Sequence, residues 1–403
     1  MNAIASRPAT PGPAIAGGAS APLKRGAVAI VGAAESDLGK VAPGLGPIDL
    51  MAQAVTRALD DCGLALRDVD GVFATTSQSR MPTLALCEYL GIQPRHHDAT
   101  NMGGASFMTM VARAQAAIEA GLCEVAVIAY GSTQRSMGRA NVAAPDINPH
   151  EAPYRPLYTA SSYALAASRH MHEYGTTRRQ LAEIAVAARQ WALRNPAAWE
   201  KKPLAIEDVL ASPMISEPLT LRDCCLVTDG GGALVVTSAA RARDLRRPPA
   251  YVLGVGEAIG HYSISAMPDL TTTAAARSGA LAYRMAGLSA REMDVAQLYD
   301  AFTITTLLFL EDLGFCPKGE GGRFVEDGRI APGGELPVNT SGGGLSYCHP
   351  GMYGIFALIE AVRQLRGECG ERQVPACNTA LAHGNGGTLS SQSTVILGNA
   401  QAL

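Results

Sequence analysis

The sequence predicts an α/β protein with a mostly parallel sheet, and three observations support this prediction. Strand-like and helix-like segments alternate from Arg25 onward, with glycine-rich turns between them. Each half of the chain places an asparagine-led, glycine-rich turn before an apolar helix, beginning at Asn101 in one half and at Asn339 in the other. Such an internal duplication implies a pseudo-twofold arrangement in which the two turns face a shared site. Finally, 47% of the 403 residues are hydrophobic and only 17% are charged, which requires thick, multi-layer packing.

The bulk composition excludes several classes of protein. The formal net charge is −3 and no basic block occurs, which argues against a nucleic-acid-binding protein. No apolar run reaches the ~18 residues that a membrane-spanning helix needs. The nine cysteines show neither CxxC nor Cys/His metal spacing, so we expect free thiols, no metal site and a reducing cytoplasm. The N-terminus is rich in Ala, Pro and Gly without the apolar core of a signal peptide, which predicts a disordered tail over residues 1–24.

The predicted N-terminal half, residues 25–245, opens with alternating strands and helices. One helix begins with Pro47 in its first turn and ends before Gly63, as is typical of helix termini. The glycines before the helix Phe107–Ala120 place backbone N–H groups at a helix N-terminus, which suits an oxyanion. The predicted elements are a strand at 26–33, the helix Pro47–Cys62, the strand Asp70–Thr75, the helix Pro82–Leu90, the helix Phe107–Ala120 and the strand Glu124–Tyr130.

Residues 131–218 interrupt this alternation. They hold polar loops and helical patterns at Thr159–Tyr174, Thr177–Asn195 and Ile206–Leu210, with no convincing strand. We therefore predict an insertion that lies over the sheet and acts as a lid or shapes the substrate site. The chain then returns to the sheet, where Asp229 and three glycines are predicted to turn tightly into the strand Ala233–Thr237.

The predicted C-terminal half, residues 246–403, repeats the pattern. Its central segment, Leu336–Gly354, joins a strand-like run to a helix and holds three consecutive glycines followed by Tyr347, Cys348 and His349. Glycines let the backbone approach a ligand and adopt positive φ, so we expect catalytic groups to gather at this turn. The predicted elements are the strand Ala250–Val255, the helix Thr272–Ala286, the strand Asp294–Tyr299, the helices Thr303–Leu313 and Ile355–Leu365, and strands near Thr379–His383 and Thr394–Gly398.

Five segments together resemble the thiolase superfamily, nearest its sterol-carrier-type branch. They are the turn and helix at 101–120 followed by GLCEVAVIAYG, the TDGGGALVV run, YDAFT at Tyr299–Thr303, the SGGGLSYCHPGMYG turn, and HGNGGTLS at His383–Ser390. The resemblance runs from about Arg25 to the C-terminus. It implies the thiolase fold, in which two duplicated βαβαβαββ halves pack as a five-layer αβαβα sandwich. It also implies a homodimer, with which the apolar composition agrees.

The resemblance carries over only part of the catalytic machinery of a thiolase. His349 matches the histidine that activates the nucleophile in that family. At the N-terminus of the first-half helix, Gly103 or Gly104 stands where the family has its nucleophilic cysteine. His383 falls where the family has its proton-transfer cysteine. The YDAF segment that begins at Tyr299 replaces the family's Asn-Glu-Ala-Phe segment, which helps to build an oxyanion hole.

These differences change the chemistry that the resemblance implies. Glycine cannot form a thioester, so acyl transfer through a covalent intermediate is not available at that position. An oxyanion hole, a histidine and two tyrosines can stabilise an acyl-CoA enolate and move a hydroxyl proton, as retro-aldol cleavage of a β-hydroxyacyl-CoA requires. In this respect the chain is similar to the thiolase-like aldolases of steroid side-chain degradation. Those enzymes lack the thiolase cysteines, use tyrosines and work with a small OB-fold partner protein.

The predicted site has two groups of residues. The resemblance implies a coenzyme A thioester as substrate and no tightly bound cofactor. A tyrosine has an ordinary pKa of about 10, so a tyrosine that acts as a base needs a neighbouring donor or cation. The predicted catalytic residues are His349, Tyr347, Tyr299 and His383, and the predicted oxyanion and substrate-binding residues are Gly103, Gly104, Gly343, Gly344 and Asp300.

Two other functions stay open on the sequence. Cys348 lies beside His349 and could act as a displaced nucleophile, which would make the chain an acyl-CoA acyltransferase or thiolase. The missing cysteines could instead mark a non-catalytic thiolase-like subunit, although a dead site need not keep His349 and a tyrosine-lined turn. His383 could simply cap its loop, and Tyr299 could only orient its turn. The isolated arginines at 135–139 are assigned no contact with CoA, and the acyl group is not identified.

Overall fold

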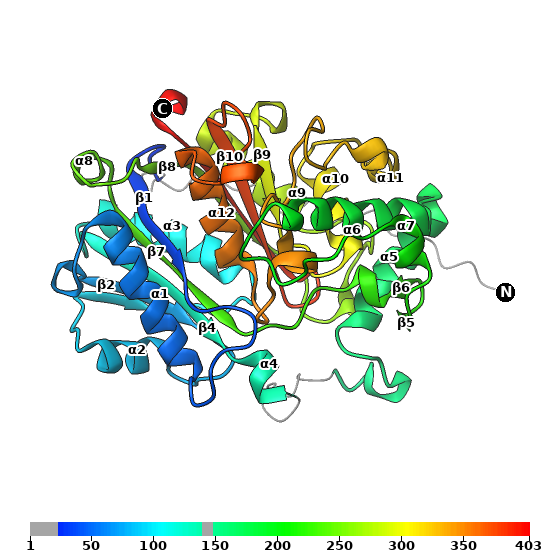
Figure 1. Ribbon diagram of the computed structural model, residues 1–403, viewed down its shortest axis with the longest axis horizontal. Helices are drawn as coiled ribbons and strands as arrows, with labels where there is room; N and C mark the ends of the chain where they lie inside the picture. The colour runs from blue at the N-terminus through cyan, green and yellow to red at the C-terminus, as the bar shows by residue number, and fades with distance from the viewer. Residues whose placement is uncertain (1–22, 139–147) are drawn as a thin grey trace.

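One mixed sheet organises the molecule. The computed structural model describes residues 23–138 and 148–403, so the predicted tail up to residue 22 lies outside the described residues. Nine strands pair in the order β3-β2-β4-β7-β1-β8-β11-β10-β9 (Figure 1). The first five of these belong to the N-terminal part of the chain and the last four to the C-terminal part. The two parts are joined where β1 pairs antiparallel with β8, at Ala29 opposite Tyr251 and Ile30 opposite Ala250.

The N-terminal part confirms the predicted alternation of strands and helices. Strands β2, β3 and β4 run parallel, and β7 pairs antiparallel with both β4 and β1. Helix α1 ends where predicted, because Gly63 adopts a left-handed conformation with φ 80°. The elements are β1 (Val28–Glu35), α1 (Pro47–Cys62), β2 (Gly71–Thr75), α2 (Pro82–Leu90), β3 (His96–Asp98), α3 (Ser106–Glu119), β4 (Val125–Ser132), β7 (Gly230–Ser238) and the short α8 (Ala239–Ala242).

The three glycines after Asp229 do not form the predicted tight turn. They belong to strand β7, in which Gly231 pairs with Gly131 of β4. A Cβ at Gly231 would lie 2.4 Å from the carbonyl oxygen of Tyr130, so the strand needs glycine there because its neighbours leave no room for a side chain. Asp229 itself accepts hydrogen bonds from the backbone of Val41 and Ser136 and so holds two loops together.

The C-terminal part repeats the topology with one strand missing. The run Leu336–Val338 before the central turn was predicted to be strand-like, but it forms only a single parallel bridge, between Val338 and Ala296 of β9. The next residue, Asn339, has φ 53° and turns the chain away from the sheet. The elements are β8 (Ala250–Ile259), α9 (Ala275–Ala286), β9 (Val295–Leu298), α10 (Thr303–Asp312), α11 (Gly321–Phe324), α12 (Gly354–Arg366), β10 (Thr379–Gly386) and β11 (Ser391–Gly398).

The helices divide the molecule into five layers. Helices α3 and α12 contact each other and contact strands from both parts of the sheet, so they form the middle layer (Figure 1). Helix α1 covers the other face of the N-terminal strands, and α9 covers the other face of β8 and β11. This order of α, β, α, β and α is the arrangement that the sequence predicts. No helix in the described ranges is long and apolar enough to cross a membrane.

The insertion lies over the C-terminal part, as the green helices of Figure 1 show. Helix α6 packs against the central turn, and α5 packs against α10. A small antiparallel pair of strands, β5 and β6, corrects the expectation that the insertion has no strand. Residues 139–147 of the insertion lie outside the described residues. The elements are α4 (Gln134–Met137), α5 (Ala160–Tyr174), α6 (Arg178–Leu193), α7 (Ile206–Leu210), β5 (Met214–Ser216) and β6 (Leu219–Thr220).

Candidate active site

The central turn is a single turn of π-helix, Gly343–Tyr347. Isolated π-turns are frequent at functional sites. The preceding Asn339 anchors the turn, because its side-chain oxygen accepts a hydrogen bond of 2.7 Å from the backbone of Leu298 at the end of β9. The glycines at 342 and 343 have φ 103° and 63°, a conformation that residues with a Cβ avoid. The turn is therefore fixed to the edge of the sheet where β9 ends.

Tyr299 and His349 form the hydrogen-bonded pair at the centre of the site. The Tyr299 hydroxyl lies 3.0 Å from Nε2 of His349 and 3.3 Å from the carbonyl oxygen of Gly351. The backbone of His349 is held by Thr228, whose hydroxyl accepts a hydrogen bond of 3.0 Å from the histidine amide. Burial lowers the pKa of His349 to about 4 and raises the pKa of Tyr299 well above its ordinary value. At neutral pH the pair therefore consists of a neutral imidazole and a neutral phenol.

The Tyr299 ring fills the place at which the thiolase resemblance puts a nucleophilic cysteine. A Cβ at Gly104 would lie 1.9 Å from Cε2 of Tyr299 and 2.7 Å from the carbonyl oxygen of Asn385. At Gly103, which has φ 61°, a Cβ would lie 2.8 Å from Cα of Gly386. Neither glycine can therefore be exchanged for a cysteine without moving its neighbours. The Tyr299–His349 pair therefore lies beside the first-half turn.

Asp300 accepts hydrogen bonds from backbone amides of the π-turn. Its Oδ1 accepts a hydrogen bond of 2.6 Å from the Gly344 amide, and its Oδ2 accepts one of 3.2 Å from the Leu345 amide. Burial raises the pKa of Asp300 to about 7, against the opposing effect of these amide hydrogen bonds. The Gly343 amide is also engaged, since it donates to the Ser341 hydroxyl at 3.3 Å. The predicted oxyanion amides of the second-half turn thus already have internal partners, and Asp300 holds this turn in shape.

The Tyr347 hydroxyl is bonded to a buried ion pair at the end of β1. Its hydroxyl donates a hydrogen bond of 2.8 Å to Glu35 at the end of β1, and Arg363 of α12 donates to the same carboxylate oxygen at 2.7 Å. The Arg363 charge and these hydrogen bonds keep the pKa of Glu35 below its ordinary value, although burial opposes this. Burial, followed by the negative charge of Glu35, raises the pKa of Tyr347. The structure therefore gives Tyr347 a place in a buried ion pair and not beside His349.

His383 lies in the sheet with both ring nitrogens engaged. Nδ1 is 2.9 Å from the Thr394 hydroxyl, and Nε2 is 2.9 Å from the side-chain oxygen of Gln392. The side chain is fully buried, and burial lowers its pKa to about 4. Only the backbone of His383 reaches the tyrosine of the site, because its carbonyl oxygen accepts a hydrogen bond of 3.1 Å from the Tyr299 amide. His383 supports the site from behind.

Two polar residues that the sequence did not single out lie beside this site. Tyr163 of the insertion stacks on Phe302 with ring centroids 4.4 Å apart. Its hydroxyl accepts a hydrogen bond of 2.9 Å from the side-chain amide of Asn385. Asn385 belongs to the HGNGG motif, which could have drawn attention to it, whereas Tyr163 lies in an ordinary helical pattern.

Cys348 is unsuited to act as a nucleophile. Its side chain is 1% exposed, and burial raises its pKa well above the ordinary value. The thiolate is the reactive form of cysteine, and a buried, protonated thiol is inert. Within the described residues, no group of three or more His, Cys, Asp or Glu side chains could hold a metal ion.

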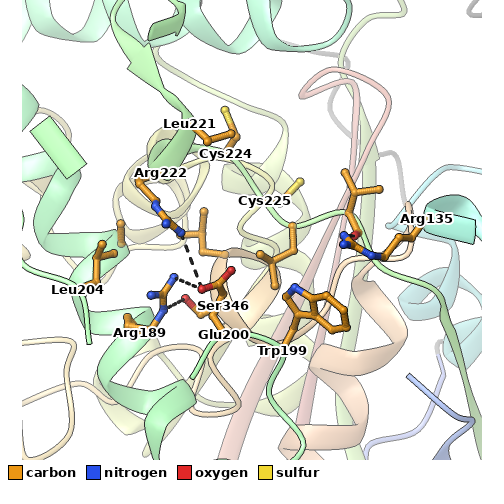
Figure 2. Close-up of a pocket in the computed structure, with 14 residues that line it drawn as sticks. Arg135, Arg189, Trp199, Glu200, Leu204, Leu221, Arg222, Cys224, Cys225 and Ser346 are labelled. Atoms are coloured by element: carbon orange, nitrogen blue, oxygen red, sulfur yellow. Dashed lines mark hydrogen bonds and ion pairs between the residues drawn. The ribbon is translucent and has the colours of Figure 1, made fainter. Parts of the chain in front are cut away.

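A pocket of about 390 Å³ lies between the insertion and the π-turn (Figure 2). Arg189 and Arg222 lie 3.5 Å and 3.8 Å from the same carboxylate of Glu200, so two positive charges share one negative charge. The guanidinium of Arg135 lies 4.6 Å from the ring centroid of Trp199. The pocket therefore carries net positive charge beside an aromatic surface. The sequence missed it because its residues come from distant segments, namely Arg135, Ala185, Arg189, Trp199, Glu200, Leu204, Leu221, Arg222, Cys224, Cys225, Leu226, Val227, Leu345 and Ser346.

Comparisons with known proteins agree with this architecture. The family model described as "Thiolase C-terminal domain-like" matches residues 256–399. A 17-hydroxy-3-oxo-4-pregnene-20-carboxyl-CoA lyase of Mycobacterium tuberculosis is 36% identical over 364 residues, which cover 85% of this chain and 92% of that protein. An acetyl-CoA acetyltransferase of Methanothermobacter thermautotrophicus is 32% identical over 90% of this chain and 96% of its own.

A solved structure gives the same result in three dimensions. The structure of the Ltp2-ChsH2(DUF35) aldolase superposes with a TM-score of 0.85 and 34% sequence identity, covering 94% of this chain and 100% of that chain. The fold, the turns and these relatives agree with one another. The chain belongs to the thiolase superfamily, in the branch that includes the steroid side-chain-cleaving aldolases.

Proposed function

We propose that this protein cleaves the C–C bond next to an acyl-CoA thioester by a retro-aldol reaction, without a cysteine acyl-enzyme. One observation carries the proposal. The Tyr299 ring lies against Gly104, where thiolases have their nucleophile, and the Tyr299 hydroxyl lies 3.0 Å from His349. Where a thiolase has a cysteine that forms a thioester, this protein therefore has a tyrosine hydroxyl that can transfer protons.

The reaction needs one proton to be taken up and returned. Tyr299 accepts the proton of the substrate's β-hydroxyl as it passes its own proton to Nε2 of His349. The bond between the α- and β-carbons then breaks, the β-carbon becomes a carbonyl, and the electron pair enters the enolate of the shorter acyl-CoA. Tyr299 delivers a proton to the α-carbon and recovers its own from His349, so the enzyme ends unchanged. The thioester oxygen of the enolate is placed at the N-terminus of α3, after Gly103 and Gly104, where the helix dipole favours negative charge.

The arginine-lined pocket is the proposed binding site for the CoA moiety. The phosphates of CoA are anionic, and Arg135, Arg189 and Arg222 outnumber the single carboxylate of Glu200. Leu345 and Ser346 of the π-turn line this pocket, so a CoA thioester bound here would lie beside the turn that precedes His349. The Mycobacterium tuberculosis relative, whose name specifies a carboxyl-CoA lyase, supports a CoA thioester as substrate.

The assembly and the compartment are also proposals. The Ltp2-ChsH2(DUF35) aldolase is named for two components, which supports our proposal of a small partner protein for this chain. We propose in addition a homodimer, in keeping with the thiolase resemblance, and a cytoplasmic location with no tightly bound cofactor.

A turnover assay tests the proposed function. The purified protein, alone and with a candidate OB-fold partner, is incubated with β-hydroxyacyl-CoAs of increasing bulk, and the products are separated by mass spectrometry. Acetyl- or propionyl-CoA should appear in equal amount to a carbonyl product. His349→Asn should abolish both products, and the half-buried, remote Tyr283→Phe should leave them unchanged. If no carbonyl product forms under any partner condition, the proposal fails.

The acetyltransferase relative favours a second candidate function, acyl transfer between CoA thioesters. It would require a nucleophile that is not at Gly103 or Gly104. Cys348 is the nearest thiol in the sequence to His349, and its burial would have to be relieved before it could react. Transfer of a labelled acetyl group between CoA thioesters, lost in Cys348→Ala, would establish it. CoA binding without turnover in either assay would instead indicate a non-catalytic subunit.

A further inference from the structure

We propose that Tyr163 of the insertion supplies a second hydroxyl to the site. This hydroxyl would donate a hydrogen bond to the oxygen on the β-carbon of the substrate. His383 is then a positioning residue, which orients Tyr163 through Gln392 and Asn385. This inference rests on the proposed function, since it assigns a contact within the same site. It names a substrate class, acyl-CoA thioesters that carry an oxygen at the β-position.

The Tyr163 hydroxyl bonds the end of β10, which packs against the first glycine-rich turn. Its hydroxyl is bonded to the Asn385 side chain at 2.9 Å and donates to the Gly387 carbonyl at 3.1 Å. A Cβ at Gly104 would lie 2.7 Å from the carbonyl oxygen of Asn385, and a Cβ at Gly103 would lie 3.1 Å from the amide nitrogen of Gly387. The two residues that Tyr163 bonds, Asn385 and Gly387, therefore line the first glycine-rich turn, against which the Tyr299 ring also lies. Tyr163 is also one of the groups that raise the pKa of Tyr299, after burial and the nearby Cys225.

A chain of buried hydrogen bonds leads from His383 to Tyr163. Gln392 accepts at its oxygen, 2.9 Å from Nε2 of His383, and its Nε2 donates to Oδ1 of Asn385 at 2.8 Å. Asn385 in turn donates from Nδ2 to the Tyr163 hydroxyl. An amide oxygen only accepts, so His383 must carry a proton on Nε2, and burial, which lowers the pKa of His383 to about 4, keeps the ring neutral at pH 7. The four side chains are at most 2% exposed, and bonds in such a chain strengthen one another.

This chain determines what the Tyr163 hydroxyl can do. Its oxygen already accepts a hydrogen bond from Asn385, and its own proton is directed to a carbonyl oxygen, that of Gly387. Tyr163 is therefore oriented as a hydrogen-bond donor, and burial, which raises its pKa, keeps the proton on it. A β-hydroxyl or the β-carbonyl that replaces it supplies an acceptor oxygen of the same kind. Substrates that lack this oxygen would leave the donor with its internal partner only.

The insertion thus contributes chemistry as well as shape. The Phe302 ring, which belongs to the YDAF segment, stacks on Tyr163 at 4.4 Å and fixes the direction of the tyrosine. Tyr163 comes from α5, and α5 packs against α10, which follows that same segment. The insertion and the catalytic segment are therefore coupled through this pair of rings.

Equilibrium binding tests the role of Tyr163 without requiring turnover. Dissociation constants are measured by calorimetry for a 3-oxoacyl-CoA, which keeps the β-oxygen and cannot undergo retro-aldol cleavage, and for the saturated acyl-CoA of the same chain length. The wild type should bind the 3-oxoacyl-CoA about five- to tenfold more tightly, as one hydrogen bond supplies. Tyr163→Phe should lose this preference, and the matched control Tyr283→Phe, whose hydroxyl donates to Leu313 at 3.1 Å, should keep it. Equal binding by the wild type, or a preference that survives Tyr163→Phe, overturns the inference.

The same binding ratio tests the role of His383. Loss of its Nε2 donor in His383→Leu should abolish the preference. His383→Gln, which retains an N–H donor near Gln392, should restore at least half of it. A purely structural role would instead weaken binding of both thioesters alike in both variants, and that result overturns the positioning role. Turnover assays on the same proteins separate the two hypotheses, because the proposed function fails only if the wild type forms no carbonyl product.

Discussion

The two glycine-rich turns look alike in sequence, but a different side chain packs against the glycines of each turn. In the first turn, Gly104 leaves room for the ring of Tyr299, which would lie 1.9 Å from a Cβ at that position. In the second turn, Gly343 leaves room for the carboxylate of Asp300, whose Oδ2 would lie 2.0 Å from a Cβ. Tyr299 and Asp300 are consecutive, so one dipeptide fills both turns.

The two turns therefore have different roles, one in catalysis and the other in structural support. The first-turn glycines make space for a hydroxyl that faces His349, and the helix that follows them, α3, presents its N-terminus there. The amides of the second turn are used internally by Asp300 and Ser341. The first turn therefore forms part of the proposed catalytic site, and the second turn is a rigid support for the segment that contains His349.

The largest expected effect is on the residue that faces the first turn. Tyr299→Phe removes the hydroxyl and keeps the ring against Gly104, so turnover should fall about 10²–10⁴-fold, as loss of a general acid–base group does. Circular dichroism and the melting temperature should change little. Tyr347→Phe is the matched control, since its hydroxyl bonds Glu35 instead of His349, and its turnover should fall far less. Equal losses in the two variants would contradict the assignment.

Filling the second turn should damage the fold more than filling the first. Gly343→Ala forces an alanine to φ 63°, which costs about 1–2 kcal/mol, and overlaps the Asp300 carboxylate, which adds about 1–3 kcal/mol. In Gly104→Ala the new methyl group overlaps the Tyr299 ring, which should cost about 1–3 kcal/mol of unfolding free energy. For a given loss of stability, Gly104→Ala should lose more turnover than Gly343→Ala. Urea denaturation and initial rates measure both quantities.

Gly260→Ala serves as the control for these two substitutions. A Cβ at Gly260 would meet no atom closer than 3.6 Å, which is an ordinary contact. Its stability and turnover should match the wild type. If Gly104→Ala and Gly343→Ala behaved like Gly260→Ala, the close packing of both turns around Tyr299 and Asp300 would be refuted.

The ion pair behind the second turn should have a moderate effect on stability. Tyr347→Phe removes one hydrogen bond to the Glu35 carboxylate, and a bond to a charged group contributes about 1.5–3 kcal/mol. The Arg363 contact remains in this variant and limits the loss. Denaturant unfolding measures the change. A stability equal to that of the wild type would mean that the Tyr347 hydroxyl does not support the turn.

Of the two turns, the second also holds a buried carboxyl group that titrates, which predicts a pH dependence. The pKa of Asp300 is raised from 3.8 to about 7, so the folded protein retains a proton that the unfolded chain loses within this range. The contribution of Asp300 to stability is therefore fully present below about pH 4 and is lost as pH rises through about 7. Between pH 5 and pH 8 the wild type should lose more unfolding free energy than Asp300→Asn. Parallel curves for the two proteins would exclude this titration.

The sequence predicts the scaffold well because the scaffold depends on local patterns. Helices such as Pro47–Cys62 carry their own start and stop signals in Pro47 and Gly63, and the structure confirms both. The missing third strand of the C-terminal part was not predictable in the same way. Leu336–Val338 reads as a strand, but the positive φ of Asn339 ends the pairing after one bridge.

The site is less predictable, because it depends on where side chains point after the chain has folded. Tyr347 and His349 are two residues apart, yet the π-turn sends the first to Glu35 and the second to Tyr299. The hydrogen bonds of Asp300 to the second turn join residues that are 44 and 45 positions apart in sequence, so no local sequence pattern predicts them. Tyr163 lies in a helix whose spacing indicates only a buried face.

The central claim is that Tyr299 and His349 perform the chemistry without a covalent acyl-enzyme. Rapid-quench mass spectrometry of the intact protein during turnover of a 3-hydroxyacyl-CoA tests it most directly. We expect the carbonyl product and the shortened acyl-CoA to accumulate while the mass of the protein stays unchanged. A protein population heavier by one acyl group, mapped by proteolysis to Cys348 or to any other thiol, would contradict the claim.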